Sequence, residues 1–468
     1  MGGCGALSRL ITKRHDEALN LIFIELKKRN PEWTFELEPR PAANVANHKP
    51  DLCATHRQSQ SVVIMDFTVR TESTSQLKMA FLQEMKQWTV FHVMLGITFI
   101  VSGIILNLLQ LILYVLVRPF NKDTCRKINF YLLYFSWSQL VALSEWWSGT
   151  VVNMYTLPEN VKYIGKEHAV LTMNHKYDIE WLMGWVIGER FNVLGNCRVY
   201  AKKVLKYIPI IGWGWALSDM IFLDRDWTKD CQNLIQNLQE LYSYVDNVWI
   251  LIFCEGTRFT KEKHEASLKF AKERGLPLLK HHLLPRTKGF VFSVKNLKGK
   301  FPALYDVTIG FSPKFAEPTM QNLLYGRKMQ ADLYVRRIPL EDIPTETEEA
   351  CAKYLFKLYE EKDELLDTYF KTGKFPFPCE PLKVEHRPYT LINLIFWACL
   401  ILIPSGYYTY QALVYGSFVM KFITVGIVAT FYFCTNKLIG ISMASKSSSY
   451  GTIGTSKESV LSEEKKSQ

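Results

Sequence analysis

The chain has 468 residues, of which 48% are hydrophobic and 22% are charged, and its formal net charge is +11. This length excludes a single small domain, and the composition allows membrane segments beside a sizeable buried core. Its 10 cysteines form no Cys-x-x-Cys pair and no cluster with histidine, which argues against a disulfide framework and a structural zinc site. We therefore expect reduced thiols that face the cytosol.

Residues 1–78 differ from the rest of the chain and form an atypical N-terminal extension. They are polar, and the stretch from Pro50-Asp51 to Asp66 resembles the restriction-like endonuclease tail of retroelements. In those proteins a PD…D pair binds a divalent metal, but no Glu-x-Lys partner follows here to complete such a site. We expect no working nuclease. The alternative is that this extension is a fused exon, with the functional start just after it.

Residues 90–117 form a run of 28 residues without Asp, Glu, Lys or Arg. About 20 apolar residues suffice to cross a hydrocarbon layer of ~30 Å, so we predict a transmembrane helix. The run starts far from Met1 and lacks a small-residue cleavage site, which excludes a cleaved signal peptide. Residues 118–127 hold four basic side chains, against Lys78 and Lys86 before the run. This asymmetry predicts that the body of the protein faces the cytosol.

The middle of the chain predicts an α/β fold. Residues 130–147 begin with 15 uncharged residues, too few for a span, and predict an interfacial or buried helix. Over residues 148–314, short apolar runs alternate with helix-like stretches, which is typical of a parallel or mixed sheet covered by helices. Residues 315–385 predict an appended helical region, because residues 346–371 have the pattern of an amphipathic helix.

A second apolar region covers residues 389–434 and is broken by Pro404. It predicts either a hairpin of two spans, which we favour, or one span and an interfacial helix. Residues 446–468 are rich in Ser, Gly, Thr and Lys and predict a disordered tail. Its Lys465-Lys466 pair resembles the dilysine signal that retrieves membrane proteins to the endoplasmic reticulum. We therefore expect a multi-pass protein of that membrane, with the C-terminus in the cytosol.

The positive charge is concentrated in residues 254–300, where 12 basic and 4 acidic residues give a local balance of +8. Such a stretch forms either a solvated helix face or a surface that attracts anionic head groups and phosphorylated substrates. Its aromatic residues are not interleaved with the charges as stacking platforms for bases would be. We therefore expect no nucleic acid as a partner of the main body.

A histidine with nearby carboxylates follows the strand-like residues 169–173. The unperturbed pKa of histidine, ~6.5, lets the neutral ring of His175 take a proton near neutral pH. A carboxylate can hold the other ring nitrogen, and both Asp178 and Glu180 are candidates. The alternative for such a histidine is a salt-bridged surface position or a satisfied position in the core.

A second motif, Glu255-Gly256-Thr257-Arg258, follows the strand-like residues 248–253. The planar fork of Arg258 suits a phosphate, and Gly256 allows the backbone to approach it closely. Glu255 is expected to position the arginine or to cap the next helix. Arg225, which follows another apolar run, is a second candidate for the anion site. The alternatives are surface ion pairs for the arginines and a simple turn for the glycine.

Other chemistries have weaker support. A hydrolase or thioesterase that forms a covalent acyl-enzyme needs a nucleophile, but the chain has no Gly-x-Ser-x-Gly motif and no Ser or Cys next to His175. His264-Glu265 is followed by Leu268 where a zinc protease motif requires histidine. We therefore predict no catalytic metal.

These motifs carry a family resemblance, because four blocks occur in the order and spacing found in glycerolipid acyltransferases. The blocks are Asn174-His175-x-x-x-x-Glu180, Phe222-x-x-Arg225, Glu255-Gly256-Thr257-Arg258, and Leu284-Pro285-Arg286-Thr287-Lys288-Gly289-Phe290. The connecting sequence, including Pro209-Ile210-Ile211-Gly212-Trp213, resembles the gamma and delta branch of the 1-acylglycerol-3-phosphate acyltransferases. The resemblance extends over most of the chain, from about residue 77 to 450.

The resemblance implies transfer of a fatty acyl group from acyl-CoA to the sn-2 hydroxyl of lysophosphatidic acid at the lipid bilayer, giving phosphatidic acid and CoA. It implies no cofactor, since acyl-CoA is a co-substrate. The family's base corresponds to His175 and its carboxylate partner to Glu180. The phosphate-binding residues correspond to Arg225, Glu255, Gly256, Thr257 and Arg258, and Pro285 belongs to the block linked to acyl-CoA.

The chain departs from the family pattern at the carboxylates. The family usually has Asp where Glu180 stands, and this branch usually has Glu where Asp178 stands, so the two appear in exchanged order. An active enzyme is our main interpretation. The alternatives are a catalytically weak or silent membrane scaffold of the same fold and an acyltransferase for another lysophospholipid.

Overall fold

The computed structural model describes residues 28, 33–37, 52–56, 62–65, 83–224, 227–377 and 380–443. The chain divides into two compact units, Met1–Leu82 and Gln83–Gln468. The first contains a three-stranded antiparallel sheet of β1 (Trp33–Leu37), β2 (Leu52–His56) and β3 (Val62–Met65).

Two predictions lie outside the described residues. One is the metal pair of Asp51 and Asp66, and the other is the tail of residues 446–468. Both stay predictions.

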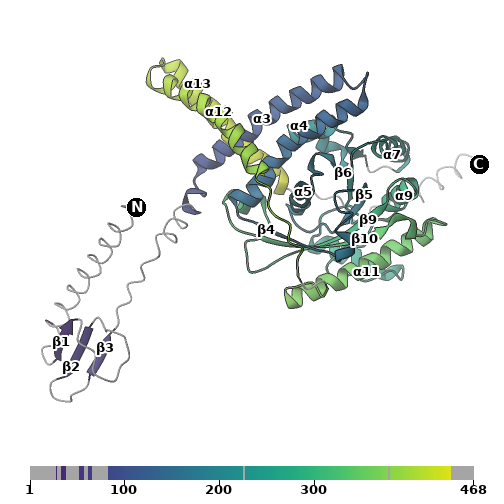
Figure 1. The fold of residues 1–468 in the computed structure, drawn as a ribbon, viewed down its shortest axis with the longest axis horizontal. Helices are drawn as coiled ribbons and strands as arrows, with labels where there is room; N and C mark the ends of the chain where they lie inside the picture. Colours follow the sequence, from purple (N-terminus) through teal and green to yellow (C-terminus); the bar gives the residue numbers. More distant parts are fainter. Residues whose placement is uncertain are drawn as a thin grey trace, which may run out of the picture. The chain divides into compact units, whose positions relative to one another are not determined.

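The second unit contains a seven-stranded sheet with the order β4-β10-β9-β5-β8-β6-β7. The pairs β9–β5, β5–β8, β8–β6 and β6–β7 are all parallel. Strand β10 is antiparallel to β9 and parallel to β4. The predicted mixed sheet covered by helices is therefore confirmed (Figure 1). Its strands are β4 (Val151–Tyr155), β5 (Ala169–Met173), β6 (Cys197–Lys202), β7 (Ile221–Leu223), β8 (Trp249–Ile252), β9 (Ala303–Phe311) and β10 (Gln330–Pro339).

The helices of this unit are α3 (Thr89–Leu116), α4 (Lys122–Ala142), α5 (Glu180–Arg190), α6 (Ile211–Ala216), α7 (Trp227–Tyr242), α8 (Lys261–Glu273), α9 (Thr287–Leu297), α10 (Met320–Leu324), α11 (Glu348–Thr372), α12 (Tyr389–Val414) and α13 (Phe418–Met443). Among them, α3 and α11 lie close to the predicted residues 90–117 and 346–371, whereas α4 begins earlier than the helix predicted at residues 130–147.

Alternate residues of the central strands belong to two separate hydrophobic clusters. In β5, Ala169 and Met173 join the cluster that includes α4 and α5, while Val170 joins the cluster that includes α7, α9 and α11. Because successive side chains of a strand point to opposite faces, helices cover both sides of the sheet. Strands buried on both faces appear as continuous apolar runs, which explains why residues 169–173 and 248–253 stand out in the sequence.

Residues 315–385, which were predicted to be helical, also contain a strand of the sheet. The helix of this region, α11, is capped by Thr347, whose hydroxyl accepts a hydrogen bond from Ala350 N at 3.1 Å, and it ends at Gly373, whose φ is +76°. The strand, β10, lies between β9 and β4. The sequence interpretation overlooked β10, because Arg336 and Arg337 interrupt its apolar residues.

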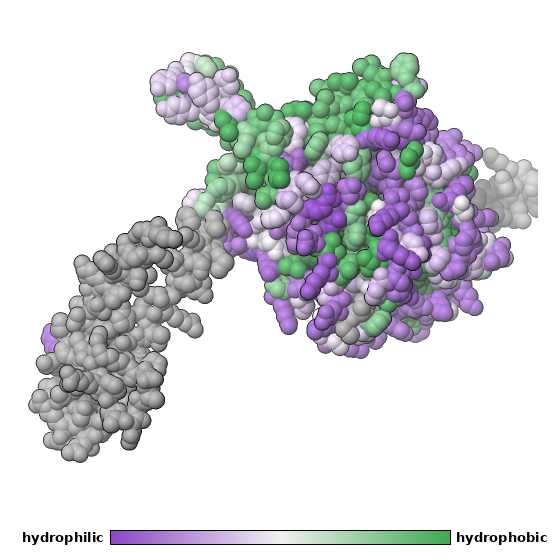
Figure 2. Space-filling view, viewed as in Figure 1, coloured by the Kyte–Doolittle hydropathy of each residue, from purple (hydrophilic) through white to green (hydrophobic). Residues whose placement is uncertain are grey.

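Three helices among the described residues are long and apolar enough to cross a membrane: α3, α12 and the Phe418–Lys437 part of α13. Figure 2 shows hydrophobic surface over α3 and the neighbouring part of α12, weakly polar surface at the far end of α12 and α13, and polar surface over most of the sheet unit. The protein is therefore membrane-associated. The short predicted helix of residues 130–147 is α4 together with a π-helical turn, and Leu133, Trp137 and Val141 place it in the core.

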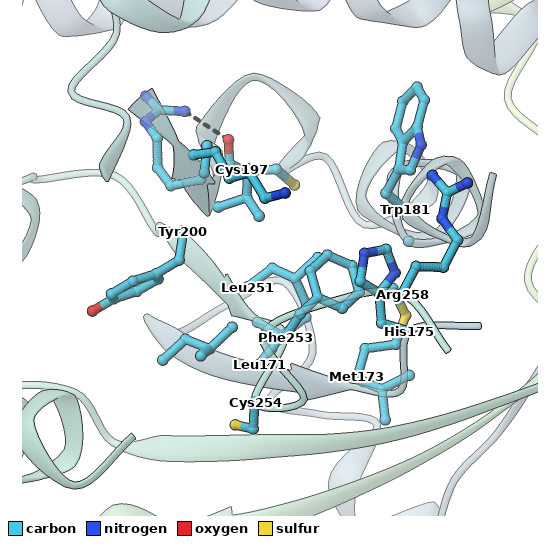
Figure 3. A pocket seen from close by; sticks show the side chains of 18 of the residues that line it. Leu171, Met173, His175, Trp181, Cys197, Tyr200, Leu251, Phe253, Cys254 and Arg258 are labelled. Carbon is cyan, nitrogen blue, oxygen red and sulfur yellow. Dashed lines mark hydrogen bonds between the residues drawn. The ribbon is translucent and has the colours of Figure 1, made fainter. Parts of the chain in front are cut away.

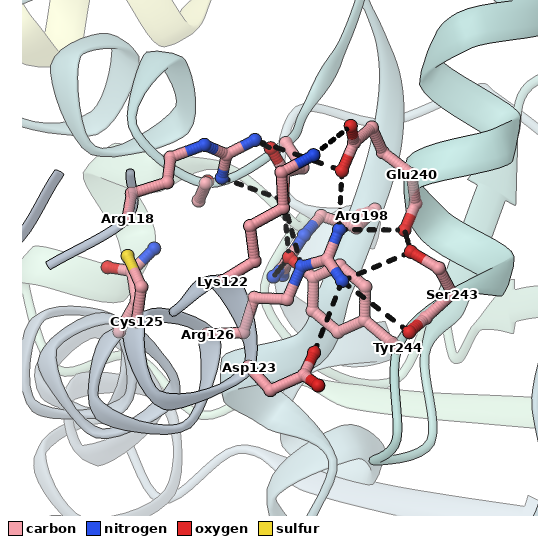
Figure 4. A network of polar contacts seen from close by, with 12 residues as sticks. Arg118, Lys122, Asp123, Cys125, Arg126, Arg198, Glu240, Ser243 and Tyr244 are labelled. Atoms are coloured by element: carbon pink, nitrogen blue, oxygen red, sulfur yellow. Dashed lines mark hydrogen bonds and ion pairs between the residues drawn. The ribbon is translucent and has the colours of Figure 1, made fainter. Parts of the chain in front are cut away.

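A polar network holds the C-terminal end of α3 and the start of α4 on the sheet unit (Figure 4). Arg118 pairs with Asp219 at 2.8 Å, and Arg126 pairs with Glu240 of α7 at 2.6 Å. The Tyr244 hydroxyl donates a hydrogen bond to Asp219 at 2.9 Å. Part of the basic charge that follows α3 therefore has partners within the protein, besides any role in membrane orientation.

Candidate active site

The two sequence motifs meet at one edge of the sheet. Strands β5 and β8 are parallel neighbours, with Thr172 opposite Ile252 in the register, so their carboxyl ends lie side by side. His175 follows β5 and Glu255 follows β8. The His175 N–H donates to Glu255 Oε1 at 2.9 Å, and Phe259 N donates to the His175 carbonyl at 2.7 Å. The two loops are therefore joined by one bond between main chains and one bond from the His175 main chain to the Glu255 side chain.

Glu180 holds both the His175 ring and the loop that carries it. One Glu180 oxygen bonds to His175 Nδ1, and the other accepts the backbone N–H groups of Lys176, at 3.0 Å, and Tyr177. The Glu180 side chain is fully buried, whereas the His175 side chain is 21% exposed. A carboxylate on Nδ1 fixes the tautomer that leaves Nε2 as the proton acceptor.

An aromatic ring supports the other side of the histidine. The rings of His175 and Phe253 stack with centroids 4.3 Å apart and planes at 26° (Figure 3). Phe253 directly follows β8, so the stack depends on the same strand pair as the main-chain bonds. In the sequence Phe253 resembles an ordinary strand end, so its contact with the histidine was not predicted.

The exchanged carboxylates have different partners. Asp178 pairs with Arg258, and Trp181 Nε1 donates to the Asp178 carbonyl at 2.9 Å. Burial raises the pKa of Asp178, the Arg258 charge opposes this rise, and the nearby Glu180 charge adds to it. Of the two candidates for the histidine partner, the structure places Glu180 on the ring and Asp178 on the arginine.

Glu255 lies in the interior, where it bonds to the loops of the site, and it does not line the cavity. Its side chain is buried, with the residue 1% exposed, and its second oxygen accepts Leu283 N at 3.0 Å. Burial raises the pKa of Glu255 to about 8, although the two backbone N–H groups favour the charged form. One carboxylate thus ties together the loop of His175 and the loop of the fourth sequence block.

The rest of this motif contacts two basic residues that the sequence analysis did not select. Gly256 has φ +70°, and a Cβ there would lie 2.8 Å from Arg286 Cδ, so this turn favours glycine. Lys263 Nζ donates to Thr257 Oγ1 at 2.9 Å and to the Arg258 carbonyl at 3.2 Å. Both residues belong to the basic stretch of residues 254–300.

The fourth block is held from α11. Asp363 accepts hydrogen bonds from Lys280 N at 2.7 Å, His281 N at 2.8 Å and His282 Nδ1 at 2.8 Å. The residues that follow this bonded turn include Pro285, which lines the cavity. Nothing in the spacing of the sequence indicates Asp363, because more than 80 residues separate it from its partners.

His175 opens into a cavity of about 1120 Å³, large enough for a ligand with long apolar parts (Figure 3). Basic side chains line one part of it: Arg258, Lys263, Arg286 and Lys288. Apolar side chains from α3, α5 and α6 line another part: Leu95, Phe99, Trp181, Trp185 and Ile211.

Arg225 and the predicted absence of a catalytic metal remain to be placed against the structure. Arg225 lies outside the described residues, so its place relative to the cavity stays a prediction. Within the described part of the chain, no group of three or more His, Cys, Asp or Glu side chains is arranged to hold a metal ion.

Family comparisons agree with this arrangement. The family model named Acyltransferase matches residues 150–312, which contain His175, Arg258 and most of the sheet, and the model named Acyltransferase C-terminus matches residues 322–397. The unit built on this sheet is therefore an acyltransferase.

Curated relatives narrow the class further. Human 1-acyl-sn-glycerol-3-phosphate acyltransferase gamma is 43% identical over 373 residues, which cover 80% of this chain and 98% of the relative. The human delta protein is 43% identical over 78% of this chain and 96% of the relative, and the mouse delta protein is 44% identical over 79% and 96%. The chain belongs to the family of 1-acyl-sn-glycerol-3-phosphate acyltransferases. The predicted resemblance is confirmed.

Proposed function

We propose that this enzyme transfers a fatty acyl group from acyl-CoA to the sn-2 hydroxyl of 1-acyl-glycerol-3-phosphate, with His175 as the general base. The observation that carries this proposal is the bonded pair of His175 and Glu180 at the wall of a cavity with basic and apolar parts. The names of the human gamma and delta relatives specify the same acceptor.

The reaction needs one proton acceptor and no covalent enzyme intermediate. His175 Nε2 takes the proton of the sn-2 hydroxyl as its oxygen attacks the thioester carbon. The C–S bond then breaks, the acyl ester remains on the glycerol, and the CoA thiolate receives the proton from the imidazolium. Glu180 stabilises that imidazolium and holds the ring in place. Because Glu180 is buried and already bonded to the ring, this stabilisation is in position before the substrate arrives.

The basic part of the cavity suits the acceptor's phosphate. Arg258 presents a planar fork, and Lys263 and Arg286 add positive charge from the same lining. Asp178 holds Arg258 in the absence of substrate and keeps its fork oriented. The acyl chains would occupy the apolar lining that α3 and α5 supply.

The proposed location is the endoplasmic reticulum membrane, with the active site facing the cytosol. The basic residues after α3 and the Lys465-Lys466 pair support this assignment. Lysophosphatidic acid, acyl-CoA and the bilayer are the proposed partners, and no cofactor is needed for the transfer.

A panel of donors and acceptors tests the proposal. Membranes containing the full-length protein are supplied with labelled acyl-CoA and, in turn, lysophosphatidic acid, lysophosphatidylcholine or lysophosphatidylinositol. We expect phosphatidic acid to form fastest. A clear preference for another lysophospholipid would assign the enzyme a different acceptor.

Arg258→Ala is expected to raise the KM for lysophosphatidic acid by about tenfold or more and to change kcat less, because the phosphate loses a bidentate partner. Arg258→Lys keeps the charge without the fork and should lie between Arg258→Ala and the wild type. Initial rates over a range of acceptor concentrations measure both constants. The matched control is Lys261→Ala, an exposed residue of the same basic stretch. An unchanged KM for Arg258→Ala would locate the phosphate elsewhere.

Glu180→Asp is expected to lower kcat by about 10- to 100-fold, because a misplacement near 1 Å in an active site costs about that much. The shorter side chain cannot reach the His175 ring and also the N–H groups of Lys176 and Tyr177 without moving the loop. Single-turnover rates on wild type and variant measure the effect. A rate equal to the wild type would show that the loop accommodates the family's usual aspartate.

A further inference from the structure

One segment of the chain both lines the cavity and is exposed on the surface of the protein. The segment of residues 203–213, which we call the portal segment, contains the 3-10 helix η4 (Lys203–Tyr207) and the first turn of α6. Three of its apolar side chains point inward and line the cavity: Leu205, Ile208 and Ile211. This thin segment therefore separates the cavity from the surroundings of the protein.

The outward side of the portal segment is apolar and aromatic. Val204 is 65% exposed, Tyr207 is 70% exposed and Trp213 is 45% exposed. Scattered exposed apolar residues are common on soluble surfaces, but here three large ones lie within ten positions of one short segment. Two exposed lysines adjoin them: Lys206 lies between Val204 and Tyr207, and Lys203, which pairs with Asp224 at 2.8 Å, precedes Val204. Aromatic, aliphatic and lysine side chains together are typical of segments that lie at a membrane surface.

The portal segment packs against α3, a helix that is long and apolar enough to cross a membrane. Ile210 is buried against α3, where a Cβ on Gly103 would lie 2.4 Å from Ile210 Cγ2. A tight turn produces this contact: Ile210 has φ +70° and ψ −70°, and Ile211 N donates to the Pro209 carbonyl at 2.9 Å. A β-branched residue with positive φ is strained, so the packing on α3 has to stabilise the turn.

We propose that the portal segment lies in the membrane interface and forms the entrance through which acyl chains pass between the bilayer and the cavity. Val204, Tyr207 and Trp213 contact lipid, while Leu205 and Ile208 contact the chain of the bound substrate. The identity of that substrate rests on the proposed function. The membrane contact itself does not depend on turnover.

Photochemical cross-linking tests the membrane contact without an activity measurement. The full-length protein with Tyr207→benzoylphenylalanine is reconstituted in vesicles of phosphatidylcholine and phosphatidylserine with labelled acyl chains. After irradiation we expect a labelled lipid adduct. The matched control is Leu278→benzoylphenylalanine, a site that is 59% exposed and lies outside the portal segment. A yield at position 207 no higher than at 278, or a protein dimer in place of the lipid adduct, would overturn the proposal.

A double variant tests the entrance. Val204→Glu with Tyr207→Glu should lower acyl transfer to long-chain lysophosphatidic acid in vesicles by about tenfold, because charged side chains resist insertion at the interface. Transfer from short-chain acyl-CoA to a short-chain, water-soluble acceptor should stay within about twofold of wild type, since these substrates need no bilayer route. Equal losses with both substrates would indicate structural damage and contradict an entrance, as would no loss with either. Absence of transfer by the wild type would overturn the proposed function, while the cross-linking result would stand.

Discussion

His175→Ala is expected to lower the rate of acyl transfer by about 10³-fold or more, because it removes both the base and the proton donor for the thiolate. The buried Glu180 would also lose its partner, which leaves its carboxylate held only by the backbone of residues 176 and 177. Positioned substrates alone still react faster than in water, so a small residual rate is expected. Turnover of labelled acyl-CoA by membranes with equal amounts of each variant measures the effect.

The matched control for this variant is His386→Ala. This side chain is 47% exposed and pairs with Glu145 at 3.0 Å, outside the cavity lining. We expect near wild-type transfer from it. If His175→Ala kept more than about a tenth of the wild-type rate, general base catalysis by this residue would be excluded, since such catalysis contributes about 10²-fold or more.

Glu255→Gln is expected to destabilise the protein by about 1–3 kcal/mol, because an amide NH₂ group must face one of two buried backbone N–H donors, His175 N or Leu283 N. The main chain of His175 would then shift, and we expect kcat to fall with the melting temperature. Thermal denaturation in detergent and initial rates on the same preparation measure both effects.

The pH dependence of stability provides an independent check on Glu255. Its pKa is about 8 in the folded protein and 4.5 for an unperturbed side chain, so the folded state binds the extra proton between these values. The contribution to stability is therefore fully present below pH ~4.5 and is lost as pH rises towards 8. Glu255→Gln should remove this decline. The control, Glu265→Gln on the exposed side of α8, should keep the wild-type profile.

Much of the site was predictable because its residues follow short apolar runs that indicate buried strands. His175 and Arg258 each follow an apolar run, and the carboxyl ends of neighbouring parallel strands meet at one edge of a sheet. Periodicity likewise located α11 to within a few residues of its observed bounds.

The remaining features depend on contacts between distant parts of the chain. Asp363 reaches His282 from α11, and β10 lies between β9 and β4, but neither arrangement leaves a local pattern. The sequence analysis also grouped Glu255 with the substrate contacts, whereas its oxygens bond to backbone N–H groups in the interior. A buried acid and an exposed acid look alike in a sequence, because burial is a property of the folded chain.

The exchanged carboxylates are less of an obstacle to catalysis than the sequence alone suggested. Glu180 begins α5, and its longer side chain spans the distance to both the ring and the loop backbone. The exchange was the only sequence feature in favour of a silent scaffold. The observed bonds favour an active enzyme instead.

The most direct test of the proposed reaction is the stoichiometry of its two products. The full-length protein in vesicles is supplied with oleoyl-CoA and 1-oleoyl lysophosphatidic acid, and free CoA thiol and phosphatidic acid are measured in the same samples. Direct transfer predicts that the two products appear in a one-to-one ratio in the wild type and that neither exceeds background in His175→Ala. Release of CoA without phosphatidic acid, or wild-type rates no higher than those of His175→Ala, would contradict it.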